Sequence, residues 1–154
     1  MASPSIISLL KKDHKEVSAL LDKAVESRDS ATEKRTRLFE EINQALTQHT
    51  RFEEESIYPI LTAKRSTKDD TLEAIEEHAQ VKHLLQDIGS TDVGDERWKA
   101  KMMVLSEDVR HHVKEEESRG GLFDELKRAA SESQLAELAE EFQQVKDRRE
   151  AAMS

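Results

Sequence analysis

The chain carries one pattern of histidine and glutamate twice. In each copy a histidine is followed 34 or 35 positions later by a second histidine, which has a glutamate four positions beyond it. The members are His14, His49, Glu53, His78, His112 and Glu116. Imidazole nitrogens and carboxylate oxygens are ligands for first-row transition metals. The duplication therefore predicts a site for a pair of metal ions, with two imidazoles and one carboxylate from each copy.

The segments that carry these residues have the composition and period of helices. Only four glycines and two prolines occur in 154 residues, and apolar residues recur every three or four positions. We predict helices over residues 4–28, 31–64, 71–88, 95–119, 122–130 and 131–150, and each histidine of the pattern lies on the apolar stripe of its helix. The predicted fold is all-α: an up-down-up-down four-helix bundle within residues 1–130. Residues 131–154 form an additional C-terminal helix, packed on the bundle or at an interface.

Local residues predict where several helices begin. Ser3 followed by Pro4 is typical of an N-cap with proline in the first turn. Ser131 and Gln134 have the spacing of a capping box, which would open the last helix.

Other residues predict breaks. Pro59 lacks a backbone N–H and should bend or weaken the end of the second helix. Gly120 and Gly121 should interrupt the fourth. Residues 65–70 and 89–95 are predicted to be polar turns.

Helical geometry decides which side chains meet. At ~1.5 Å per residue, the distances from the predicted turns place all four stripe histidines within about one helical turn of the same level. At ~100° per residue, His49 and Glu53 share a face. His111 and His83 fall off the inward stripe and are placed outside the metal shell. Tyr58, five positions after Glu53, is assigned no role.

The ligand types favour iron. Burying two carboxylates and four imidazoles among apolar residues would cost several kcal/mol unless metal ions compensate them. The chain has no cysteine, which excludes thiolate sites and iron–sulfur clusters. It also lacks the His-Glu-x-x-His motif of zinc proteases and the Glu-x-x-His pairs of ferritin-type bundles. We therefore expect two iron ions bridged by the glutamates, with manganese or zinc less favoured.

Charge and hydropathy bear on partners and location. The formal net charge of −9 disfavours nucleic acid and anionic membranes as partners. No apolar run approaches the ~20 residues that span a bilayer, and the first residues lack the features of a secretory signal. A cytoplasmic protein, monomeric or homodimeric, is expected.

The full pattern resembles a known family. The order His, His-x-x-x-Glu, His, His-x-x-x-Glu, together with Tyr58 and the Glu-Glu-Glu runs at residues 53–55 and 115–117, resembles the hemerythrin-like (HHE cation-binding) domain. The resemblance covers about Ile6 to Lys127. It implies a four-helix bundle that holds an oxo- or hydroxo-bridged di-iron centre and meets O2, NO or peroxide.

Two departures from the family bear on function. The oxygen-carrying hemerythrins have His-x-x-x-His on the third helix, where this chain has His78 and Lys82. With one histidine fewer, roughly two coordination positions stay open, as is typical of reactive metal sites. Phe123 lies eleven positions after His112, whereas Tyr58 lies nine after His49, which indicates an insertion or a distorted turn.

These observations order the candidate functions. Redox or stress sensing, or peroxide detoxification, is favoured over reversible O2 transport and storage. The alternatives are an iron- or oxygen-responsive regulatory module without catalysis and a metal-free structural bundle. The residues leave open whether the centre turns over peroxide in a catalase-like reaction.

Overall fold

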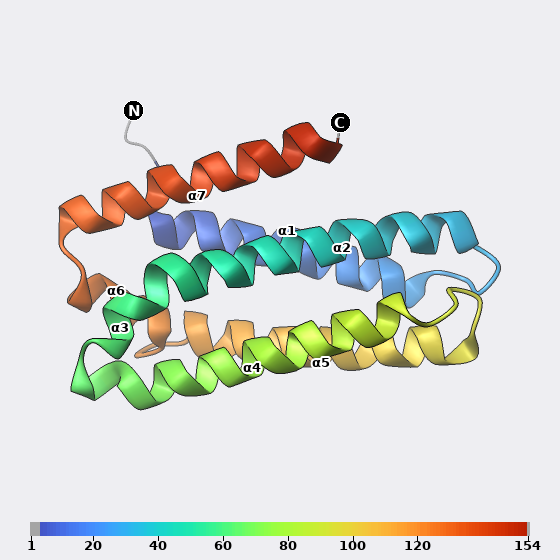
Figure 1. Cartoon of the computed structure of the whole chain (residues 1–154), viewed down its shortest axis with the longest axis horizontal. Helices are drawn as coiled ribbons and strands as arrows, with labels where there is room; N and C mark the ends of the chain where they lie inside the picture. The colour runs from blue at the N-terminus through green and yellow to red at the C-terminus, as the bar shows by residue number, and fades with distance from the viewer. Residues whose placement is uncertain (1–3, 154) are drawn as a thin grey trace.

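Four long helices form the body of the protein. The computed structural model describes residues 4–153, and among these it contains helices and no strand. The long helices are α1 (Ile6–Glu26), α2 (Thr32–Phe52), α4 (Arg65–Gly89) and α5 (Glu96–Glu117), and they run alternately up and down the long axis (Figure 1). The predicted all-α four-helix bundle with an additional C-terminal helix is confirmed.

The second helix of the bundle changes its winding shortly after Phe52. A π-helical turn, η1 (Glu53–Ile57), is followed by the short helix α3 (Tyr58–Thr62). The backbone N–H of Tyr58 bonds to the carbonyl of Glu53, five residues back. Pro59 lies in the first turn of α3, where its missing N–H costs little. The predicted weakening near Pro59 thus takes the form of a π turn placed just before the proline.

Two glycines end α5. Gly120 has a φ of +79°, in the left-handed region that favours glycine. A Cβ on Gly121 would lie 2.2 Å from the carbonyl oxygen of Glu115, so only glycine fits this approach. The predicted interruption is confirmed, and the chain continues into α6 (Leu122–Ala129). The turn carries Phe123 back against the bundle.

The C-terminal helix α7 (Glu132–Met153) lies along the outside of α1 and α2 (Figure 1). Its predicted capping box is confirmed: Ser131 Oγ accepts from the N–H of Gln134, and Gln134 Oε1 accepts from the N–H of Ser131. Leu138 and Phe142 are buried in the core.

The predictions differ from the structure at two places. Helix α1 begins at Ile6, with Ser5 as the N-cap accepting from the N–H of Ser8 at 3.1 Å. Ser3 lies outside the described residues. Residues 65–70 were expected to form a turn but belong to α4. Leu72 of α4 is 45% exposed, because the inward face of the helix there passes through Thr71 and Ala74.

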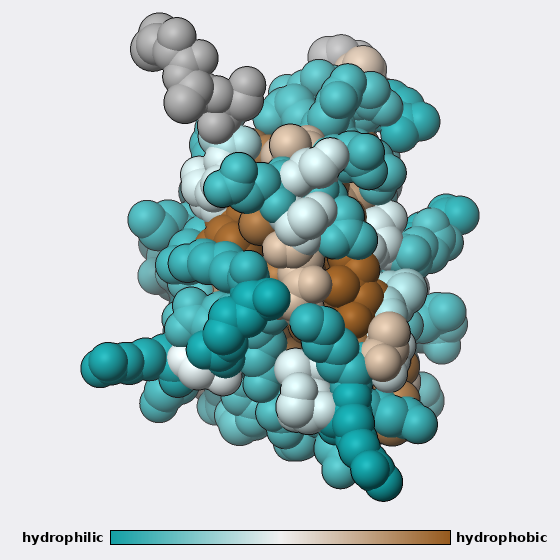
Figure 2. Space-filling view, turned by 90° about the vertical axis from the view of Figure 1, so that its left-hand side faces the viewer, coloured by the Kyte–Doolittle hydropathy of each residue, from teal (hydrophilic) through white to brown (hydrophobic). Residues whose placement is uncertain are grey.

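The apolar core consists of two clusters with a polar layer between them. One cluster lies at the end formed by α3 and α6 and includes Leu10, Phe52 and Ala74. The other lies toward the opposite end and includes Val17 and Val81. Along the chain, each histidine of the pattern falls between residues of the two clusters. Figure 2 views the end formed by α3 and α6, where apolar surface shows between hydrophilic side chains.

Candidate metal centre

The six residues of the duplicated pattern meet in the polar layer between the two clusters. All six are at most 8% exposed, and Glu53 and Glu116 are fully buried. Helices α1, α2, α4 and α5 each contribute one histidine, and the glutamates come from η1 and α5. The structure therefore brings together every residue expected at the site. Their role as metal ligands stays a prediction.

The first half of the site is built from α1 and α2. The Nε2 atoms of His14 and His49 lie 3.1 Å apart. Glu116 Oε1 lies 3.3 Å from Nε2 of His14, and Glu53 Oε1 lies 3.3 Å from Nε2 of His49. Two imidazole nitrogens and two carboxylate oxygens thus converge on one point.

The second half is built from α4 and α5 and uses the same two glutamates. The Nε2 atoms of His78 and His112 lie 3.0 Å apart. Glu53 Oε1 is 3.3 Å from Nε2 of His78, and Glu116 Oε2 is 3.4 Å from Nε2 of His112. Each glutamate therefore contacts a histidine in both halves, which is the arrangement that two bridging carboxylates would have.

The donor atoms fit metal ions. Both carboxylate oxygens of Glu53 and Oε1 of Glu116 are buried and have no hydrogen-bond partner among the described residues. An ionised carboxylate left without partners in the interior costs several kcal/mol. Cations held between the imidazoles and these oxygens would remove that cost. His14, His49 and Glu116 form one candidate metal-binding group, and Glu53, His78 and His112 form the other.

A ring of four carboxylates orients the imidazoles from outside. Nδ1 of each histidine is hydrogen-bonded to a carboxylate from the neighbouring helix of the bundle. The pairs are Asp13 with His49 at 2.7 Å, Glu54 with His78 at 3.3 Å, Glu77 with His112 at 2.8 Å, and Glu117 with His14 at 2.7 Å. When Nδ1 donates to a carboxylate, Nε2 keeps its lone pair for a metal. Sequence reasoning missed this ring, although each carboxylate is adjacent in the chain to one of the six site residues.

Tyr58 also reaches the second half of the site. Its hydroxyl donates to Glu116 Oε2 at 2.9 Å and lies 3.2 Å from Nε2 of His78. An α-helical period places Tyr58 about 140° away from Glu53 around the helix. The π-helical bond from Tyr58 to Glu53 adds one residue to the turn, so the two side chains share a face. The sequence signal that could have found this residue is Pro59, which follows Tyr58 directly and marks a break in the regular α-helical period.

Aromatic rings cover the first half. The ring of Phe123 stacks on His14, with centroids 5.6 Å apart and planes at 10°. Phe142 of α7 meets His49 edge-on at 5.9 Å. The two halves thus differ: a phenol oxygen faces the second, and phenyl rings pack against the imidazoles of the first.

The family model of the hemerythrin HHE cation binding domain matches residues 5–119. This chain belongs to that family. The range includes all six site residues, Tyr58 and the four orienting carboxylates, whereas α6 and α7 lie beyond it.

Two known proteins are similar to this chain. A solved structure of an HHE cation binding domain-containing protein from Mycobacterium kansasii superposes with a TM-score of 0.69 at 25% identity, covering 94% of this chain and 86% of that one. A protein of Nostoc sp. named DNA nickase is 29% identical over 144 residues, covering 94% of this chain and 40% of that protein. This chain therefore spans about two fifths of the length of the curated relative.

The remaining expectations for this HHE protein concern His83 and His111, membrane-spanning helices and nucleic acid. His83 and His111 are exposed, as predicted. His111 pairs instead with Glu115 at 2.9 Å on the surface. No described helix is long and apolar enough to span a membrane. The name of the Nostoc relative keeps nucleic acid open as a partner, against the expectation from net charge.

Two histidines of the HHE site, His49 and His112, hold their protons more tightly than a free imidazole does. Burial by itself would lower the pKa of His49, but the charges of Glu53 and Asp13 outweigh it and raise that pKa well above its usual range. Burial also opposes the charge on His112, yet Glu116 and Glu53 raise the pKa of His112 to about 10. Metal ions and protons therefore compete for the same nitrogens.

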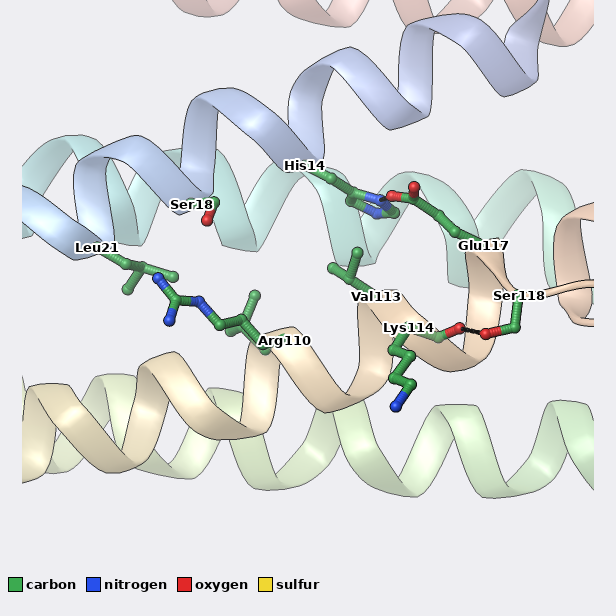
Figure 3. A pocket seen from close by; sticks show the side chains of 9 residues that line it. His14, Ser18, Leu21, Arg110, Val113, Lys114, Glu117 and Ser118 are labelled. Atoms are coloured by element: carbon green, nitrogen blue, oxygen red, sulfur yellow. Dashed lines mark hydrogen bonds and ion pairs between the residues drawn. The ribbon is translucent and has the colours of Figure 1, made fainter.

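A pocket of about 350 Å³ leads from solvent toward His14. It lies between α1 and α5, and its lining includes Ser18, Val113 and Glu117. Figure 3 shows His14 and Glu117 pointing toward one another at its wall, with Ser18 and Val113 beside them. This pocket opens to solvent beside His14 of the first half of the HHE site.

Proposed function

We propose that this protein is a non-haem di-iron member of the hemerythrin HHE family. It would bind O2, NO or peroxide at the His/Glu centre, in cytoplasmic redox or stress sensing or in peroxide detoxification. The observation that carries the proposal is the pair of buried glutamates. Each contacts histidines of both halves, and three of their four oxygens form no hydrogen bond to the described residues. The metal-binding unit would be the bundle within residues 1–130.

The six residues of the centre would have different roles as metal ligands. His14 and His49 would hold one ion, His78 and His112 the other, and Glu53 with Glu116 would bridge them. Iron bound there would supply a redox-active Lewis acid for a diatomic ligand or peroxide. Phe123, stacked on the His14 ring, would hold that imidazole in place.

Tyr58 supports ligand chemistry other than simple O2 storage. Its hydroxyl holds a proton 2.9 Å from Glu116 Oε2, beside the second half of the centre. Burial and the charges of Glu53 and Glu116 raise the pKa of Tyr58 well above its usual range, so the metal-free protein keeps this proton. Lys82, which stands where oxygen carriers have a histidine, is exposed and takes no part. A phenol beside the second half, with no imidazole at position 82, would favour sensing or peroxide chemistry.

Metal analysis with the visible spectrum tests the proposal. Purified protein should carry close to two irons per chain, and its absorption should change on adding O2, NO or peroxide. His78→Gln should remove at least one iron, whereas His83→Gln, on the exposed side of the same helix, should keep both. One zinc per chain, or equal loss of iron in the His78→Gln and His83→Gln variants, would contradict the di-iron proposal. A long-lived, reversible oxy complex would instead favour O2 storage.

The relative from Nostoc suggests contact with DNA as a second candidate. The match covers 94% of this chain but 40% of that protein, so the nicking named there can belong to the remaining part. The net charge of −9 opposes binding to phosphates. Supercoiled plasmid is incubated with iron-loaded protein and with metal-free protein to test for nicking. If iron-loaded wild type relaxes the plasmid and the His78→Gln variant does not, DNA chemistry at this centre is favoured.

A further inference from the structure

The C-terminal helix α7 directs two cations into the protein. Lys146 and Arg149 are 4% and 7% exposed. Buried cations are costly unless they are paired. Arg149 donates to Asp13 Oδ1 at 2.7 Å, and Lys146 Nζ lies 3.7 Å from the same oxygen. Lys146 also pairs with Glu16 at 3.0 Å. Helix α7 is therefore tied to α1 through a fully buried aspartate.

The same aspartate holds a histidine of the candidate centre. Asp13 Oδ2 accepts from His49 Nδ1 at 2.7 Å, while Asp13 Oδ1 is held by Arg149. Phe142, also on α7, packs edge-on against the His49 ring. Helix α7 thus contacts His49 in two ways: directly through Phe142, and indirectly through Arg149 and the Asp13 carboxylate.

The other three orienting carboxylates have no such support. The side chains of Glu54, Glu77 and Glu117 are 41%, 18% and 31% exposed. Among the described residues, none of the three forms an ion pair with lysine or arginine. Asp13 differs from them in being buried and anchored by α7. The structure thereby singles out His49 among the four histidines.

We propose that Arg149 is a positioning residue, which fixes His49 through Asp13 so that α7 sets how tightly the first half of the centre holds its ion. With Oδ1 anchored, Asp13 keeps Oδ2 on Nδ1 of His49. Nδ1 then stays the protonated nitrogen and Nε2 faces the centre. The inference rests on the proposed metal site, and it deepens that proposal by distinguishing the two ions.

Release of iron tests the first consequence. Protein loaded anaerobically with ferrous iron is mixed with a ferrous chelator, and release is followed by absorbance. Loss of a partner that orients a ligand typically weakens metal binding about 10- to 100-fold. Arg149→Gln should accelerate release of one of the two ions by that factor and leave the other at the wild-type rate.

Matched variants separate positioning from loosening of α7. Arg148→Gln changes an exposed neighbour on the same helix and should have no effect. Glu16→Gln removes the Lys146 ion pair without touching Asp13, and should also have no effect. In an Asp13→Asn background, Arg149→Gln should add nothing. If Arg149→Gln does not fold, Arg149→Lys keeps a cation there and should accelerate the same ion to a smaller extent.

A second measurement needs no metal. In the metal-free protein, NMR should show the Nδ1–H proton of His49 protected from exchange with water, and Arg149→Gln should speed that exchange. The positioning role would be overturned if Arg149→Gln changed neither the exchange of the His49 Nδ1–H proton nor the rate of iron release. It would also be overturned if Glu16→Gln accelerated iron release as much as Arg149→Gln does. Wild-type protein that takes up no iron would contradict the proposed function, and the exchange measurement would still decide the role of Arg149.

Discussion

Each histidine at the centre is fixed at both ring nitrogens. Nε2 lies within 3.4 Å of one of the two glutamates, and Nδ1 is held by a carboxylate of the next helix in the ring. Because every orienting group comes from a neighbouring helix, the site forms only when all four helices are packed. The six side chains alone would leave the imidazoles free to rotate.

Tyr58 provides a prediction at the scale of one atom. Tyr58→Phe removes the hydroxyl that donates to Glu116 Oε2 and leaves this buried oxygen without that donor. The free energy of unfolding of the metal-free protein should fall by about 1–3 kcal/mol. The iron-loaded variant should keep two irons, because the six ligands remain, but its visible spectrum should change. Chemical denaturation and metal analysis check both, with Phe39→Leu as a control far from the site. An unchanged spectrum would remove Tyr58 from the centre.

The raised histidine pKa values give a pH prediction. The pKa of His112 rises from 6.5 to about 10 in the metal-free fold, so the stability from its charge is present below 6.5 and is lost as pH rises through about 10. The pKa of His49 shifts in the same direction. The melting temperature of the metal-free protein should therefore fall between pH 6.5 and 10.

The loaded protein should respond to pH with the opposite sign. Metal binding requires neutral imidazoles, so occupancy should drop as protons compete at falling pH. Thermal unfolding with chelator and with iron, measured across this range, compares the two slopes. Slopes of the same sign in both states would show that protons and metal do not share the histidine nitrogens.

At the scale of elements, α1 and α5 form the walls of the pocket that leads to His14. Ser18 of α1 is half-buried and lines the pocket that leads to His14. Ser18→Phe should fill the pocket and slow NO binding several-fold, while both irons stay bound. Ala19→Phe, one position away and exposed, is the matched control. Stopped-flow mixing with NO measures the rate, and equal rates in both variants would indicate a different entrance.

The turn elements also shape the site. The π turn η1 brings Tyr58 onto the face of Glu53, and the turn at Gly120 and Gly121 brings Phe123 onto His14. Both are departures from regular α-helix located next to functional residues. The centre therefore depends on two local irregularities as well as on four regular helices.

At the scale of the whole molecule, Arg35 fixes the end of the bundle opposite α3 and α6. It is fully buried, donates to the carbonyls of Ser27 and Val93 at 2.9 Å and 2.7 Å, and lies 4.6 Å from the ring centre of Trp98. It thereby joins the α1–α2 connection to the α4–α5 connection.

Replacement of this arginine separates stability from metal binding. Arg35→Met should lower the free energy of unfolding by about 2–4 kcal/mol, because two carbonyls lose their donor. Arg37→Met, exposed on the same helix, should change it by less than about 0.5 kcal/mol. Iron content at 20 °C should match wild type in both. Iron loss without loss of stability would contradict this separation of roles.

The sequence by itself determined the helices and the side chains that face inward. The recurrence of apolar residues every three or four positions and the lengths between turns are local properties, so they place His14, His49, His78 and His112 at one level. They also put Glu53 and Glu116 beside them. The same reasoning failed at residues 65–70, because the contacts that extend α4 are made with other elements.

The tertiary structure decided what surrounds those six residues. The carboxylate ring, the entrance beside His14 and the link from Arg149 to Asp13 join residues on different helices, and no periodicity along one helix encodes them. Tyr58 was missed for another reason: a constant 100° per residue does not hold through a π turn. The inward face of each helix is a local property, whereas the partners that orient, shield and anchor a side chain are set only when the helices pack.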